Sequence, residues 1–213
     1  MASQVSSQSA SNISGWSSPD FSGIRRYEVY HTMFRYKYNI LANGKQLLHA
    51  DNSSFTPGKP DLTFHSGADK NGPVVSVCKF LHFSRHLKIG LGDPNFPNDV
   101  VWEGLTAENL MLNKYRIEMT IGGKRRSFLW KLSVFSHDSK LVDEQTQAVI
   151  AMFHSSHFSL KKTGRLEIYK TYGSDFELMV LTSALALAER RRRRESGGAG
   201  SGGDGGGGGG NGG

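Results

Sequence analysis

The residues from Phe176 to Ala188 are apolar on every side of a helix, and five arginines, Arg190–Arg194, follow them. The polar exceptions are Glu177, Thr182 and Ser183. A helix that is hydrophobic all round is buried, either inside a protein or in a bilayer. Thirteen helical residues rise only about 20 Å, well short of a bilayer. We therefore expect a buried helix from Asp175 to about Arg190, and no transmembrane span.

Both ends of this helix carry further signals. Ser174 lies three residues before Glu177, which is the capping-box spacing for a helix start. The arginine run has three interpretations, which the sequence leaves open. It complements the negative end of the helix and holds the helix in place, it contacts anionic lipid, or it is a nuclear-localisation or RNA-contact segment.

The chain before this helix consists of short strand patterns separated by turn signals. Arg116–Ile121 alternates strictly, Gly122-Gly123 turns the chain, and Phe128, Trp130 and Leu132 share a face of the next strand. About ten to twelve such strands at hairpin spacing favour a barrel or sandwich. Because a barrel of that size is too wide for its own side chains to fill, the apolar helix supplies the missing interior.

The predicted fold class is therefore all-β with one helix. It is a closed antiparallel β-barrel of about twelve strands around a buried hydrophobic C-terminal helix. The side chains predicted to point inward are Ile117, Met119, Phe128, Trp130, Ile150, Leu166 and Ile168. The segment Lys161–Gly164 is predicted to be a turn between two strands.

Composition separates this domain from two low-complexity ends. Residues 1–23 are rich in serine and residues 195–213 are almost all glycine, so both are predicted to be disordered around a domain at 24–194. The N-terminus lacks the charged and apolar regions of a secretory signal. The expected location is the cytoplasm, with membrane association and the nucleus as alternatives, and the expected state is a monomer.

The order of these motifs resembles the tubby C-terminal-like superfamily, which includes tubby proteins, phospholipid scramblases and LURP-one-related proteins. The segments that carry the resemblance are Arg126–Lys131, Ala148–Phe153, Gly164–Ile168 and Leu181–Leu187. Over residues 26–194 the chain looks most like the small tubby-like proteins of filamentous fungi. The resemblance implies a twelve-stranded barrel around a hydrophobic C-terminal helix and a general tendency toward lipid or membrane-surface binding. No counterpart of the phosphoinositide-binding pattern of tubby proteins is present to carry over.

No motif indicates catalysis, so we expect a protein that is not an enzyme and has no cofactor. His82 with His86, and His154 with His157, have spacings found in metal sites, but no third ligand cluster accompanies either pair. We therefore expect no metal. Cys78 is the single cysteine and lies in a strand pattern, where a free cysteine is usually a small core residue.

Basic residues provide the remaining functional signal in a chain of net charge +7. The candidate residues for lipid or anion binding are Arg85, Lys88, Lys124, Arg125, Arg126, Lys161, Lys162, Arg190, Arg191, Arg192, Arg193 and Arg194. Loop tips at one end of a barrel can converge on a phosphate, because arginine and lysine match its charge. The simpler alternative is that these residues are solvated and block edge pairing.

Three functions are thus expected in order. The first is recognition of anionic phospholipid or phosphoinositide headgroups at a membrane surface. The second is a protein-interaction or structural role with an unknown protein partner. The third is nucleic-acid binding through the arginine run.

Overall fold

A computed structural model describes residues 15–19, 23–32, 37–53, 59–81, 84–156, 159 and 161–198 of this chain. Its strands are β1 (Arg25–His31), β2 (Lys37–Ala42), β3 (Lys45–Asn52), β4 (Leu62–Ser66), β5 (Val74–Phe80), β6 (Leu87–Leu91), β7 (Val101–Ala107), β8 (Lys114–Ile121), β9 (Lys124–Leu132), β10 (Ser139–Asp143), β11 (Val149–Ser155) and β12 (Lys162–Ile168). A 3₁₀ turn, η1 (Pro97–Asp99), precedes β7, and the helix α1 (Ser174–Gly198) follows β12.

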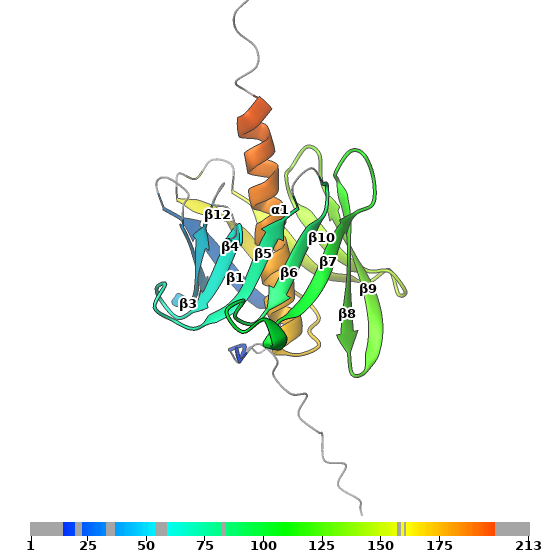
Figure 1. The fold of residues 1–213 in the computed structure, drawn as a ribbon. Coiled ribbons are helices and arrows are strands. Elements are labelled where there is room, and N and C mark those ends of the chain that lie inside the picture. The colour runs from blue at the N-terminus through cyan, green and yellow to red at the C-terminus, as the bar shows by residue number, and fades with distance from the viewer. Residues whose placement is uncertain are drawn as a thin grey trace, which may run out of the picture.

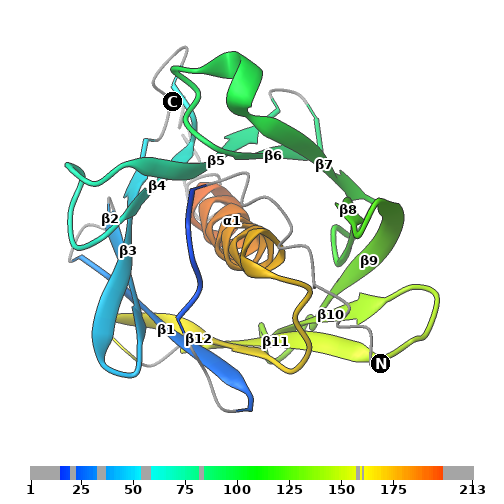
Figure 2. The same ribbon diagram turned by 90° about the horizontal axis from the view of Figure 1, so that it is seen from below.

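The strands form a closed antiparallel barrel in which each strand pairs with its neighbours in sequence and β1 pairs with β12. The helix runs through the barrel, as Figure 1 shows from the side and Figure 2 along its length. It lies closest to β5 and β6. The predicted fold class is confirmed.

This topology gives the barrel two ends with different connections. The loops β1–β2, β3–β4, β5–β6, β7–β8, β9–β10 and β11–β12 lie at the end where the last turns of α1 emerge, at the top of Figure 1. We call it the arginine end, because Arg190–Arg194 lie there. The opposite end carries the other connections, including the turn between β8 and β9 and the start of α1.

The core lies between the inner face of the barrel and α1. All seven side chains predicted to point inward are buried, and the exposed fractions of Phe128, Trp130 and Leu166 are 0%. Every residue of α1 from Phe176 to Leu187 is also buried. The expectation of an apolar helix filling the barrel is thus confirmed.

The polar residues within α1 bond to the barrel wall. The hydroxyls of Thr182 and Ser76 lie 2.7 Å apart, and the Trp130 indole N–H donates to Ser183 Oγ at 3.0 Å. The Tyr27 hydroxyl donates to Glu177 at 2.9 Å. A buried polar group without a partner is costly, so these pairs restrict the depth and rotation at which α1 is stable in the barrel.

The structure differs from the sequence prediction at both ends of α1. The helix continues to Gly198, well past the predicted Arg190, because the arginines are good helix formers that find partners on the barrel. At its start, Glu177 does not serve as a simple capping-box residue. Its carboxylate receives hydrogen bonds from Thr171 and Tyr27 and an ion pair from Arg25.

The strand prediction differs in two places. Lys162–Gly164 belongs to β12 instead of a turn, because Gly164 pairs with Val29 of β1 and Ser155 of β11. A Cβ at Gly164 would stand 2.5 Å from the His154 carbonyl oxygen, so the strand needs glycine here. The strands β1 and β7 were not anticipated by the turn signals at all.

Trp16 is 4% exposed and belongs to the core, although it lies in the segment predicted to be disordered. Most of residues 1–23 and all of 199–213 lie outside the described residues. The domain boundaries proposed there remain predictions.

Candidate functional site

The first arginines of the run bond to loop carbonyls at the arginine end. Arg190 donates to the carbonyl oxygens of Ser84 at 2.8 Å and His86 at 3.2 Å. Arg191 donates to the carbonyl oxygen of Ser133 at 2.6 Å. Burial lowers the pKa of both guanidinium groups, which nevertheless stay charged. These bonds connect α1 to the β5–β6 and β9–β10 loops.

The next two arginines surround a buried carboxylate, Glu189. This side chain accepts hydrogen bonds from Tyr38 at 2.5 Å and Asn52 at 2.9 Å, and it pairs with Arg192 at 2.5 Å and Arg193 at 2.8 Å. Burial by itself would raise the pKa of Glu189. The hydrogen bonds from Arg192, Tyr38 and Arg193 outweigh burial, so the pKa lies below its usual value.

Arg193 also reaches the barrel directly. It pairs with Asp61 at 2.7 Å and donates to Asn52 Oδ1 at 2.7 Å. Four of the five arginines therefore hold the helix in the barrel, as the first interpretation of the run expects. Arg194 is the exposed member of the run.

The other predicted site residues do not converge on one pocket. Lys124, Arg125 and Arg126 lie at the opposite end of the barrel, on the β8–β9 turn. Arg125 forms a two-pronged ion pair with Glu103 at 2.5 Å, and Arg126 pairs with Asp143 at 2.8 Å. These pairs leave Lys124 as the exposed cation of the turn among these three residues.

The remaining predicted cations lie on the barrel wall and at the arginine end. Lys88 is exposed on the wall, in β6. Arg85 and Lys161 are exposed in the β5–β6 and β11–β12 connections at the arginine end. Lys162 pairs with Glu28 at 2.9 Å.

A row of lysines that the sequence analysis missed crosses the outer wall near the arginine end. Lys114 of β8 pairs in register with Lys131 of β9, which pairs with Lys140 of β10. None of the three forms an ion pair within the described residues. Lys131 and Lys140 line a depression of about 330 Å³ together with Met152. Like charges placed directly opposite each other across a sheet are destabilising, so this lysine row favours an anionic partner.

Two loops beside this lysine row expose large apolar side chains. In the β7–β8 loop, Leu110 is 79% and Met111 is 76% exposed. In the β9–β10 loop, Val134 is 62% and Phe135 is 95% exposed. Both loops stand at the arginine end, at the upper right of Figure 1. We call these four residues the apolar tips.

The histidines and the cysteine take ordinary structural positions. His86 Nδ1 accepts a hydrogen bond from the backbone N–H of Ala107 at 3.1 Å, and His154 faces Asp138 at 3.6 Å. His82 and His157 lie outside the described residues. Cys78 is fully buried, and burial raises the pKa of its thiol. Among the described residues, no group of three or more acidic, histidine or cysteine side chains is arranged to hold a metal ion.

Comparison with known proteins supports the fold. No protein-family model and no curated protein matches this sequence. The structure is similar to the X-ray structure of a protein from Arabidopsis thaliana, with a TM-score of 0.53 and 12% sequence identity, over 78% of this chain and 91% of that chain. At that identity the likeness concerns the fold alone. No helix within the described part of the chain combines the length and apolarity needed to cross a bilayer.

Proposed function

We propose that this protein is a non-enzymatic binding module that docks on anionic phospholipid surfaces with its arginine end. The observation that carries the proposal is the placement of the apolar tips directly beside the lysine row. Apolar side chains insert into the headgroup region of a bilayer, and neighbouring lysines attract anionic lipid. The two features face the same end of the barrel because β7–β8 and β9–β10 are neighbouring loops.

Electrostatics favours this end over the other. The lysine row and the exposed Arg85, Lys161 and Arg194 supply cations, and each contributes about 1 kcal/mol near an anionic surface. At the opposite end, Arg125 and Arg126 are neutralised by carboxylates. The arginine run contributes through Arg194 and the half-buried Arg191, because its other members bond to the barrel.

The exposed apolar area supports a membrane in preference to nucleic acid. Phe135 and Leu110 project from loop tips, where they have no use against a phosphate backbone. A soluble protein that exposes such side chains together generally uses them in binding. Nucleic acid remains the alternative for the arginine run, and a protein partner is the subject of the next section.

Co-sedimentation with liposomes tests the proposal. The full chain is mixed with phosphatidylcholine vesicles, with or without 30% phosphatidylserine, at low and high salt. We expect sedimentation only with the anionic vesicles. It should weaken at high salt, since salt screens exposed charges. Lys114→Glu and Phe135→Ser should each reduce binding about tenfold.

Two matched variants at the opposite end serve as controls. Lys124→Glu changes an exposed lysine that begins β9, as Lys114 begins β8. Phe96→Ser changes a phenylalanine that is 62% exposed in the β6–β7 loop. Both controls should bind like the unchanged protein. Equal loss in the controls, or no binding to anionic vesicles at low salt, would contradict the proposal, and a steep salt-dependent affinity for RNA would favour the nucleic-acid alternative.

A further inference from the structure

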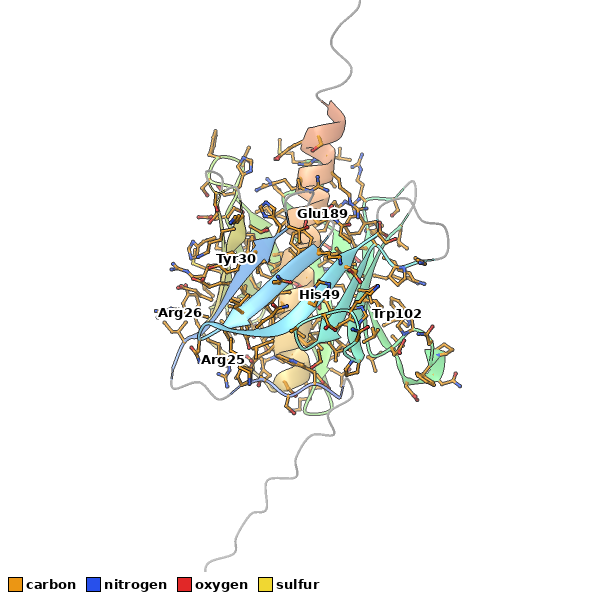
Figure 3. The ribbon with its side chains drawn as sticks, turned by 90° about the vertical axis from the view of Figure 1, so that its left-hand side faces the viewer. Arg25, Arg26, Tyr30, His49, Trp102 and Glu189 are labelled. Carbon is orange, nitrogen blue, oxygen red and sulfur yellow. The ribbon has the colours of Figure 1, made fainter. Side chains whose placement is uncertain are left out.

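A second surface lies on the barrel wall over β5, β6 and β7, away from the apolar tips. We infer that this surface, which we call the Trp102 groove, binds a short extended segment of a partner protein that carries a carboxylate two residues from an aromatic side chain. The groove has a volume of about 400 Å³ and is lined by Lys79, Leu81, Lys88, Pro94, Pro97, Val100 and Trp102. Figure 3 shows Trp102 on the outer side of the barrel.

The apolar part of the groove is built around Gly90. This residue of β6 pairs in register with Trp102 of β7. A Cβ at Gly90 would stand 2.7 Å from Val100 Cγ1 and 3.1 Å from Trp102 Cε3, so both side chains lie directly over the glycine backbone. Trp102 is thereby held flat against the wall, yet 37% of it stays exposed. A tryptophan held in this way offers a broad apolar face to a partner.

The charged part of the groove is a second pair of opposed lysines. Lys79 of β5 pairs in register with Lys88 of β6, and neither forms an ion pair within the described residues. The ammonium group of Lys79 lies 5.3 Å from the centre of the Trp102 ring. An anionic group bound here would relieve the repulsion between the two lysines.

The register of β6 sets the spacing of the partner's side chains. Lys88 and Gly90 are two residues apart on the outer face of β6, with Trp102 over Gly90. Successive side chains on one face of an extended chain are separated by about 6.6 Å. A partner segment lying along β6 would therefore place a carboxylate on the lysines and an aromatic ring on Trp102 when these residues are two apart. The prolines of the β6–β7 loop border the aromatic position.

Trp102 itself reports binding, because Trp16 and Trp130 are buried at 4% and 0% exposure. The full chain, labelled with ¹⁵N, is titrated with the peptide acetyl-Glu-Glu-Ser-Phe-Pro-amide while the indole N–H resonances are followed. We expect a saturable shift of the Trp102 resonance, with the Trp16 and Trp130 resonances unmoved. Peptides with both glutamates replaced by glutamine or lysine, or with serine for phenylalanine, should bind at least about tenfold more weakly.

Protein variants complete the test. Lys88→Glu, and Lys79→Glu with Lys88→Glu, should each weaken peptide binding at least about tenfold, whereas Lys114→Glu should leave it unchanged. Conversely, Lys88→Glu should retain most of the liposome binding, so the two proposals can fail separately. Thermal melting of each variant confirms folding. The inference is overturned if the glutamate peptide leaves Trp102 unmoved, if the lysine peptide binds equally, or if anionic vesicles shift Trp102 where peptides do not.

Discussion

Glu189 is the residue on which the arginine end is organised. Its side chain is 0% exposed and joins α1 to Tyr38 of β2, Asn52 of β3 and two arginines of its own helix. Breaking such a buried network removes charged hydrogen bonds and leaves partner groups unsatisfied. The carboxylate is thus a structural group, and the arginines around it are committed to holding it.

We expect Glu189→Gln to lower the free energy of unfolding by about 1–3 kcal/mol at pH 7. The pKa of Glu189 in the folded protein lies below its usual value of 4.5, so its contribution is present above that pH. It is lost as the pH falls from 4.5 through the folded-state pKa. Urea unfolding at pH 7, 5 and 3 should therefore show the difference between the two proteins narrowing at pH 3. A difference that stays constant over this range would contradict the assigned role.

At the scale of the element, α1 takes the place of the packed side-chain layers that fill smaller barrels. It contributes Phe176, Leu178, Met179 and Leu181 to the core, each of them 3% exposed or less. Its start is anchored by Glu177 and its end by Glu189. Since both anchors are on the barrel, the helix and the sheet depend on each other for stability.

Leu181→Asp should therefore prevent the domain from folding. It buries an unpaired charge and removes apolar contacts, which together exceed about 4 kcal/mol. Leu110→Asp makes the same chemical change at an apolar tip that is 79% exposed. This control should change the free energy of unfolding by only about 0.5 kcal/mol while weakening liposome binding. Circular dichroism and urea unfolding distinguish the two, and a folded Leu181→Asp protein would contradict the role given to α1.

The whole molecule is one closed unit, because β1 and β12 complete the sheet around the helix. The chain has no free sheet edge within the described barrel at which unfolding could begin strand by strand. Its two proposed binding surfaces lie at different places on this rigid frame, one at the arginine end and one on the wall.

We expect unfolding to be a single cooperative transition. The loss of helix, followed at 222 nm, and the loss of side-chain packing, followed by near-ultraviolet circular dichroism, should coincide in urea. The reason is that α1 is apolar on all sides and has no stable state outside the barrel. A helix signal that persists after the packing signal is lost would show that α1 and the sheet unfold separately.

The outline of this fold could be predicted from sequence because its cause is local. Strict alternation at Arg116–Ile121 identifies a strand with one buried face, and an all-apolar helix demands an enclosure. Both patterns follow from the geometry of a single element. The strands β1 and β7 lacked such patterns, and the strand Lys162–Ile168 was obscured because Gly164 in it resembles a turn residue.

The site depended on tertiary structure, because charge acts through distance. The sequence determined that this chain has an apolar core helix, an arginine run and several basic clusters. Only the folded barrel decided which arginines are neutralised, as around Glu189, and which lysines are opposed across strands. Strand register brings Lys114, Lys131 and Lys140 into one row, and loop alternation sends Lys124 to the other end. Register and alternation are properties of paired strands, so neither can be read from the residues of one strand alone.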